Sequence, residues 1–343
     1  MFSTQFDKAL ENIEPTQDDK DHAPEAHDQV KTVLAADDVI SGWGFSPILI
    51  GSYKRRVSIR RMKDVDVFGR LLTVGADELP ATLLKEFERV LKAAFPAVNG
   101  KPRVARQARS LQVAFPEYDG LYVDAVPARP YTTPYGEKVW QLPMRNEQDW
   151  QVTNPEELGR LTTELNDADH HNGMYVPTVK LMRQTRRSLM GKKKPGGLVV
   201  EIATLHAFRT GRVGGATQAE YFVSALRETA TVLTSAFVLG LGLDDPTLQG
   251  EKVYVRGDDA DKQALANAFR EAADKAETAL HNSDRCAAAK AFRDILGKAV
   301  DDLGNNDYVF PMPSECNLDG TVKRFAAVTA GDRQVPAGNR RFG

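Results

Sequence analysis

The chain has 343 residues and a formal net charge of −2 at pH 7, with 42% hydrophobic, 27% charged and 8% aromatic residues. This ordinary globular composition excludes a wholly disordered chain and allows a sizeable core with two lobes. No apolar run reaches the roughly 18 residues of a membrane span and the N-terminus lacks a signal-peptide pattern, so we expect a cytoplasmic protein that does not use a membrane.

Two further composition features concern cysteine and local charge. Cys286 and Cys316 provide neither a zinc cluster nor a disulfide framework, which favours a reducing compartment. Positive charge gathers in residues 54–63, 101–109 and 180–194, with six, four and seven cations and no acid. Local basic blocks in a near-neutral chain are typical of a polyphosphate site rather than a general nucleic-acid coat, although each block alone also suits a solvated face.

Hydrophobic periodicity predicts a mixed first half and a helical second half. The first half is expected to contain helices at 3–14 and about 22–41 with a break at Pro15 and 16–21, strands around 45–52 and 64–68, a helix at 80–95, and a hairpin of 111–115 and 121–126. Residues 129–149 are predicted to be an irregular connection. Beyond them we expect helices at 177–190, 198–210, 217–239, 258–281 and 283–303, and a flexible tail at 319–343.

The stretch from 48 to 68 carries the main functional signal. Asp64 and Asp66 alternate with valines, so in a strand both carboxylates face the same side while the valines enter the core. Two carboxylates held so close repel unless a cation lies between them, and hard oxygen ligands suit Mg²⁺. The preceding Gly51-Ser52 turn has the flexibility and donors to hold a phosphate.

A third aspartate, Asp124, interrupts the return strand of the predicted hairpin. A carboxylate in a buried strand requires a partner, and a salt bridge is one explanation. If sheet pairing brings Asp124 to Asp64 and Asp66, the three supply the ligands of a two-metal site, where the ions lie about 3.5 to 4 Å apart.

In this order of motifs the chain resembles the DNA-polymerase-β-like nucleotidyltransferases. Within them it is similar to the bacterial cyclic-oligonucleotide synthases (CD-NTases), relatives of cyclic GMP-AMP synthase and oligoadenylate synthase. The resemblance rests on GSYKRRVSIRRMKDVDVF, ARSLQVAF, VDAVPA, NPEE, VPTVKLMRQTRRSL and KKPGGLVVEIATLHAF, and it covers about 33–208. It implies an α+β fold: a mixed-sheet polymerase-β-like palm (33–150) with a helical C-terminal lobe (151–318), preceded by a helical segment (1–32) and followed by a tail (319–343).

Carried over by position, the resemblance implies that Asp64, Asp66 and Asp124 hold two Mg²⁺ ions, with Mn²⁺ as an alternative. It implies that Gly51 and Ser52 bind the donor triphosphate. The remaining implied triphosphate ligands are Lys180 and Arg183, where Arg183 replaces a family lysine. The Ser-Tyr pair that contacts phosphate and base in some relatives is replaced here by Gly197-Leu198, so base stacking has to come from elsewhere.

The function implied is synthesis of a cyclic di- or trinucleotide second messenger from ATP and other NTPs, with release of pyrophosphate, in anti-phage (CBASS) signalling. Only the product would reach an effector, and no nucleic acid is required. Two alternatives remain: a template-independent RNA nucleotidyltransferase of the CCA-adding or poly(A) type, and an inactive nucleotide-binding scaffold. The terminal Gly343 further suggests attachment of the C-terminus to a target by a ubiquitin-transferase-like partner, because a glycine fits a narrow site.

Overall fold

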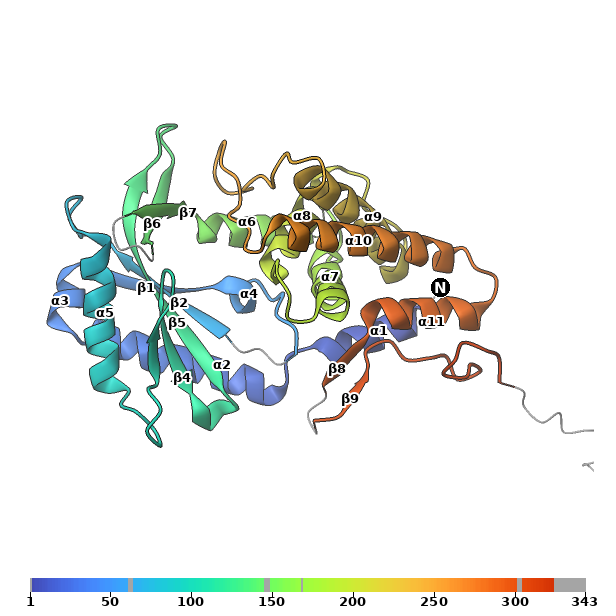
Figure 1. The fold of residues 1–343 in the computed structure, drawn as a ribbon, viewed down its shortest axis with the longest axis horizontal. Coiled ribbons are helices and arrows are strands. Elements are labelled where there is room, and N and C mark those ends of the chain that lie inside the picture. The colour runs from blue at the N-terminus through green and yellow to red at the C-terminus, as the bar shows by residue number, and fades with distance from the viewer. Residues whose placement is uncertain (1, 61–63, 145–148, 168, 301–303, 324–343) are drawn as a thin grey trace, which may run out of the picture.

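A mixed sheet with covering helices forms one side of the molecule and a bundle of helices forms the other (Figure 1). The computed structural model describes residues 2–60, 64–144, 149–167, 169–300 and 304–323. Within these ranges the predicted α+β architecture, with a mixed-sheet palm and a helical C-terminal lobe, is confirmed. None of the described helices is long and apolar enough to cross a membrane.

The palm sheet runs in the order β1-β2-β5-β4-β3, and β6 and β7 extend it from the far end of β5. Its strands are β1 (Phe45–Ile50), β2 (Asp64–Leu71), β3 (Val104–Arg106), β4 (Leu111–Phe115), β5 (Leu121–Thr132), β6 (Lys138–Pro143) and β7 (Trp150–Thr153). β2 and β5 are parallel, whereas the other neighbours are antiparallel. The parallel pair matters most, because it joins the two aspartate-bearing strands directly.

Helices cover one face of this sheet. They are α2 (Gln17–Ala35), α3 (Asp38–Gly42) and α5 (Pro80–Ala94), whereas the short α4 (Gly51–Lys54) continues β1. Apolar side chains of α2 and α5, such as Val30 and Phe87, pack on Val65, Val67 and Val123 in one buried cluster. Because side chains alternate along a strand, this packing directs the residues between these valines to the opposite face.

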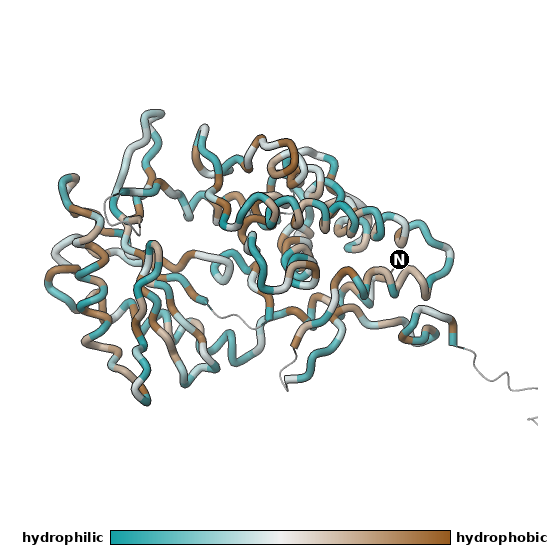
Figure 2. The backbone as a smooth tube through the Cα atoms, viewed as in Figure 1, coloured by the Kyte–Doolittle hydropathy of each residue, from teal (hydrophilic) through white to brown (hydrophobic). Residues whose placement is uncertain are grey.

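The helical lobe contains α6 (Pro155–Asn166), α7 (Tyr175–Met190), α8 (Gly197–Arg209), α9 (Gln218–Phe237), α10 (Asp259–Leu280) and α11 (Arg285–Leu296). A hairpin of β8 (Lys298–Val300) and β9 (Asn306–Tyr308) follows. The N-terminal helix α1 (Ser3–Ile13) also belongs to this core, since Phe6 contacts the rings of Phe222, Phe292 and Phe310. Hydrophobic positions recur along these helices (Figure 2). The N-terminal segment therefore divides its packing between the lobe, through α1, and the palm, through α2.

Several predicted elements need correction. The break at 16–21 is wrong, because Thr16 caps α2 by accepting from Asp19 N–H, and the side chain of Asp19 accepts from Thr16 N–H. The irregular connection at 129–149 is wrong as well, because the end of β5 pairs with β6. The last helix ends at Leu296, because Gly297 at its C-cap is a stop signal that outweighs the apolar residues beyond it.

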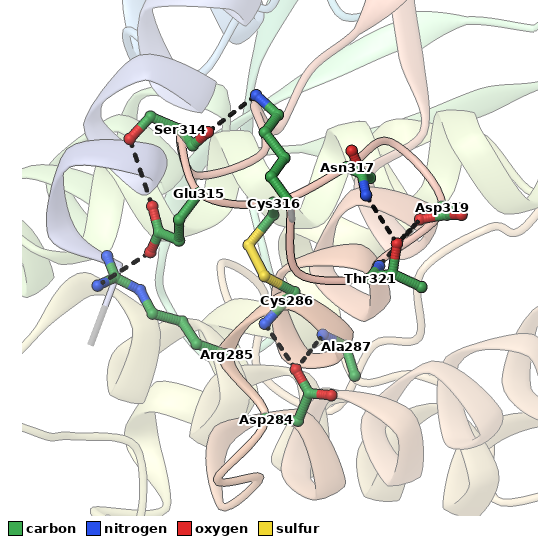
Figure 3. The surroundings of a disulfide bond; sticks show 11 residues. Asp284, Arg285, Cys286, Ala287, Ser314, Glu315, Cys316, Asn317, Asp319 and Thr321 are labelled. Carbon is green, nitrogen blue, oxygen red and sulfur yellow. Dashed lines mark hydrogen bonds and ion pairs between the residues drawn. A yellow bond between two sulfur atoms is a disulfide. The ribbon is translucent and has the colours of Figure 1, made fainter. Parts of the chain in front are cut away.

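The cysteine prediction is also wrong. Cys286 and Cys316 form a disulfide, with Cα atoms 5.3 Å apart (Figure 3). Two cysteines 30 residues apart form no recognisable sequence pattern. Their pairing depends on the chain after β9, which folds back on α11. A hydrogen bond that Arg293 Nη1 donates to Leu318 O at 3.1 Å holds this chain in place. The cysteines therefore no longer argue for a reducing compartment.

The chain after β9 that folds back on α11, called the strap below, shortens the part of 319–343 to which the predicted tail can apply. Residues 319–323 are ordered: Lys323 N–H donates to Glu315 O at 2.7 Å and Cys316 forms a β-bridge with Val322. The remainder of the predicted tail, including Gly343, lies outside the described residues.

Candidate active site

The parallel pairing of β2 with β5 brings the three predicted aspartates together. In its register Asp66 lies opposite Asp124, and Asp64 lies opposite Tyr122. Val65, Val67, Val123 and Ala125 point into the palm core, so all three carboxylates project from the other face. The strand register thus brings Asp64, Asp66 and Asp124 together, as the sequence predicts.

The electrostatics show that these carboxylates interact. The pKa of Asp66 is raised to about 7, first by burial and then by the charges of Asp64 and Asp124, against the opposing charge of Arg55. The pKa of Asp124 is raised to about 6, first by burial and then by Asp64, against a 3.4 Å hydrogen bond donated by Ser110. Like charges held together without full compensation favour either a proton or a cation.

The donor set fits a divalent cation. Ionised carboxylates are acceptor-only hard oxygen ligands, which Mg²⁺ and Mn²⁺ prefer, and mutual repulsion of this kind is relieved when a cation binds. Among the side chains that the structure describes, no group of three or more acids, histidines and cysteines is already drawn together tightly enough to hold a metal. The observation that supports a cation here is the register that sets Asp66 beside Asp124 on one face of the sheet, and the raised pKa values of both acids agree with it.

The Gly51-Ser52 turn lies directly against this cluster. β1 ends at Ile50, opposite Asp66, and Gly51 takes φ of +81°. A Cβ on Gly51 would collide with Asp66 Oδ2, so both the backbone angle and the close approach require glycine. Ser52 Oγ is hydrogen-bonded to Ser58 Oγ at 2.9 Å. The turn thus places backbone donors and a hydroxyl beside the carboxylates.

The two predicted cations of α7 have carboxylate partners in this structure. Lys180 Nζ donates to both oxygens of Glu14 at 2.6 Å, and Arg183 Nη1 donates to Glu201 Oε2 at 2.8 Å. Glu201 is 1% exposed and also accepts from Arg55 Nε at 2.6 Å. These cations would have to exchange or share their carboxylates to contact a phosphate.

The sequence reasoning did not single out Arg55, Glu201 or Arg187. Burial, with the charges of Arg183 and Arg186, lowers the pKa of Arg187 to about 10, and its Nη1 donates to Arg60 O at 3.0 Å. Its place in the basic block 180–194 was a usable signal. No comparable signal marks Glu201, which is separated from Arg55 by 146 residues.

The replacement of the Ser-Tyr pair also has a structural consequence. A Cβ on Gly197, the first residue of α8, would lie 3.4 Å from Arg183 Cζ, so the guanidinium passes beside this glycine. Leu198 is 48% exposed and carries no ring or hydroxyl. The start of α8 therefore provides neither function of the missing pair.

A mixed-sheet palm, paired aspartate strands and an adjacent Gly-Ser turn together define a nucleotidyltransferase. More particularly, residues 1–166 match the family model of the Second Messenger Oligonucleotide or Dinucleotide Synthetase domain, SMODS. This match covers almost half of the chain. It confirms the predicted resemblance to the cyclic-oligonucleotide synthases and the predicted enzyme class.

Solved structures of CD-NTases share the fold. Escherichia coli MS115-1 CdnC with ATP is 17% identical, with a TM-score of 0.64, and the match covers 86% of this chain and 97% of that one. Bradyrhizobium diazoefficiens CdnG with GTP is 16% identical, with a TM-score of 0.61 and coverage of 86% and 96%. Rhodothermus marinus CdnE, a c-UMP-AMP synthase with Apcpp and Upnpp, is 16% identical, with a TM-score of 0.59 and coverage of 82% and 98%. No curated protein sequence matches this chain.

Proposed function

We propose that this protein is a metal-dependent nucleotidyltransferase that joins NTPs into a cyclic di- or trinucleotide and releases pyrophosphate. The parallel pairing of β2 with β5, which sets Asp124 beside Asp66, with Asp66 next to the Gly51 turn, carries this proposal. The ATP and GTP bound by CdnC and CdnG support NTPs as substrates. Because NTPs are cytoplasmic metabolites, the proposal places the enzyme in the cytoplasm, with its product acting as a second messenger in anti-phage defence.

The reaction forms a bond between a ribose hydroxyl oxygen of one nucleotide and the α-phosphorus of another, while the bond to pyrophosphate breaks and the hydroxyl proton leaves. Asp64, Asp66 and Asp124 would hold two Mg²⁺ or Mn²⁺ ions. When bound, such ions lower the pKa of the attacking hydroxyl and neutralise the leaving pyrophosphate. A second transfer closes the ring.

The chain's own residues would bind and orient the donor. The Gly51 turn and Ser52 would hold the triphosphate next to Asp66 through backbone amides and a hydroxyl. Lys180 and Arg183 would supply charge from α7, with Lys180 sharing its ammonium between Glu14 and a phosphate oxygen. Positioning and charge neutralisation then account for the catalysis.

The test is a double substitution, Asp64→Asn with Asp66→Asn, assayed with all four NTPs and Mg²⁺ in the absence of RNA. We expect pyrophosphate release to fall by at least about a hundredfold, because the carboxylate charge that holds the ions is lost. Circular dichroism reports whether the fold is kept, and mass spectrometry identifies the wild-type product.

Asp119→Asn is the matched control, since Asp119 is exposed in the turn between β4 and β5. It should retain wild-type turnover. Retained turnover in the double variant would overturn the proposal. A wild-type product that forms only when RNA is added would support an RNA nucleotidyltransferase instead.

A further inference from the structure

One buried carboxylate joins the active-site edge of the palm to the helical lobe. Glu201 of α8 uses both of its oxygens: Arg55 Nε donates to Oε1 at 2.6 Å, and Arg183 Nη1 donates to Oε2 at 2.8 Å. The side chain of Glu201 is 1% exposed and that of Arg55 is 6% exposed. Arg55 directly follows α4, which lies on the side of the palm sheet that faces the lobe (Figure 1). Glu201 therefore binds one cation from the palm and one from α7.

The Gly51 turn is hydrogen-bonded to the segment that contains Arg55. Arg55 N–H donates to Gly51 O at 3.3 Å, and Val57 N–H donates to Ser52 O at 3.0 Å. The hydroxyl of Ser52 is in turn hydrogen-bonded to that of Ser58 at 2.9 Å. The turn and Arg55 thus belong to one hydrogen-bonded segment, so the position of the Arg55 guanidinium constrains the amides and the hydroxyl of the turn.

Arg183 contacts its acid differently from Lys180. The ammonium of Lys180 donates to both oxygens of Glu14, whereas Arg183 uses Nη1 for Glu201, and its buried Nε has no hydrogen-bond partner within the described ranges. A guanidinium carries several N–H donors in a rigid fork, and the side chain of Arg183 is 18% exposed. Arg183 can therefore donate to a phosphate while Glu201 still holds it.

The energetics of this triad favour a geometric role over a stabilising one. Removing charges from water offsets much of their attraction, so replacing a buried ion pair with apolar side chains is often neutral or stabilising. Removing a single partner is strongly destabilising, because it leaves a buried charge unpaired. A displacement of Arg55 or Glu201 alone is therefore costly, and the triad fixes where both groups lie.

We propose that Glu201 is a positioning residue for the donor triphosphate. Through Arg55 it fixes the Gly51-Ser52 turn, and through Arg183 it fixes the guanidinium of α7, so that the two phosphate-binding elements keep one separation. This inference rests on the proposed function, in which both elements contact the same triphosphate. Glu201 itself touches no substrate.

The first experiment separates positioning from stability. Arg55→Met combined with Glu201→Leu replaces the buried pair with apolar side chains and leaves the net charge of the site unchanged. Its midpoint of urea unfolding should lie closer to wild type than that of Glu201→Gln, because the buried pair is removed whole. Two other quantities should nevertheless worsen by about ten- to a hundredfold, the cost of a displacement of about 1 Å. They are kcat/KM for pyrophosphate release and, with Mg²⁺, the dissociation constant of an ATP analogue that carries a methylene between the α- and β-phosphorus and so cannot react.

Arg55→Lys is a second and milder variant. It keeps the charge that Glu201 requires but replaces the planar fork with a single ammonium on a different stem. We expect it to unfold near the wild-type urea midpoint and to bind the analogue several-fold more weakly.

The matched control removes another arginine pair together. Arg103 Nη2 donates to Glu117 Oε1 at 2.9 Å, the two side chains are 13% and 45% exposed, and Glu117 lies in the 3-10 turn Pro116–Tyr118 that follows β4. Arg103→Met with Glu117→Leu also loses the hydrogen bond from Arg103 Nε to Ala114 O. It should lower stability but leave analogue binding and kcat/KM at their wild-type values.

The outcomes distinguish the inference from the proposed function. If analogue binding and turnover stay at wild type in both Arg55 variants, Glu201 has a purely structural role and the inference fails. Tighter binding in the double variant would mean that Glu201 competes with the phosphate for Arg183, which would also overturn it. If wild type makes no product from NTPs but binds the analogue more tightly than both variants do, the proposed function fails while the positioning role of Glu201 stands.

Discussion

Two charge centres lie within the same site, and their acids respond in opposite ways. The pKa of Asp66 in the palm is raised to about 7, by burial and then by Asp64 and Asp124. The pKa of Glu201 in α8 is lowered although burial alone would raise it, because Arg55 and Arg183 both act on it. Burial raises the pKa of both acids, and the neighbouring charges decide whether that rise is kept, as at Asp66, or reversed, as at Glu201.

Arg55 connects the two centres. Its Nε donates to Glu201 Oε1 at 2.6 Å, and its charge also acts on Asp66. Since Glu201 engages this guanidinium, Asp66 receives only part of its charge. The α8 centre is thus compensated by the protein itself, whereas the carboxylate row retains a need for external positive charge, as a metal-dependent site requires.

The largest predicted effect comes from removing the acid of the compensated centre. Glu201→Gln leaves Arg55 and Arg183 without their shared carboxylate in a dry environment, so we expect the free energy of unfolding to fall by about 3 to 5 kcal/mol. Urea unfolding at pH 7.5 measures this loss.

Glu277→Gln provides the control, because Glu277 pairs with Arg227 at the surface, where both side chains are at least 37% exposed. That change should cost at most about 1 kcal/mol. If the two substitutions lowered the free energy of unfolding equally, Glu201 would contribute no more to stability than a surface ion pair, and the prediction would be wrong.

The next effect has the opposite sign. Asp66 has a folded-state pKa of about 7 against an ordinary value of 3.8, so the folded metal-free protein binds this proton more tightly than the unfolded chain. Its contribution to stability is therefore present below about pH 4 and is lost as the pH rises to about 7. Asp66→Asn removes that loss and should stabilise the metal-free protein at pH 8 by at most about 4 kcal/mol.

Thermal unfolding in EDTA at pH 4 and pH 8 checks this second prediction. The gain should appear at pH 8 and nearly vanish at pH 4, and Asp119→Asn should give no such pH-dependent gain. If Asp66→Asn destabilised the protein at pH 8, positive groups of the protein would already neutralise Asp64, Asp66 and Asp124. The three aspartates would then not differ from Glu201, and the prediction would be wrong.

The sequence was sufficient for the parts of this site that depend on local alternation. Asp64 and Asp66 between valines, and Asp124 in VDAVPA, indicate strands with one polar face, and the predicted hairpin is present as β4 and β5. The partner of Arg55 was not predictable, since Glu201 lies 146 residues away on a helix that reads as apolar. Only tertiary packing brings the two together.

The errors in the fold have similar physical causes. β6 is a short strand, KVWQLP, that lacks the apolar-polar alternation of a half-buried strand, and it pairs with the partly exposed end of β5. The disulfide joins α11 to the strap that folds back on it, and the positions of two isolated cysteines do not predict this reversal of the chain. Edge pairing and chain reversal are set by long-range contacts rather than by residue periodicity.

The smallest predicted effect concerns the ion pair of Lys180 with Glu14. Its burial lies between that of the buried Glu201 pairs and that of the surface Glu277 pair, because the lysine side chain is 11% exposed and the glutamate 43%. Glu14→Gln should change the free energy of unfolding by only about 1 kcal/mol, because half-exposed pairs are screened by solvent. It should also tighten binding of inorganic triphosphate several-fold, measured by calorimetry without metal, since the ammonium no longer has to leave a carboxylate. Glu11→Gln, from the exposed pair with Lys8, should change neither quantity. If Glu14→Gln weakened triphosphate binding, or cost as much stability as Glu201→Gln, Lys180 would have a structural role in α7 and would not be a ligand of the triphosphate.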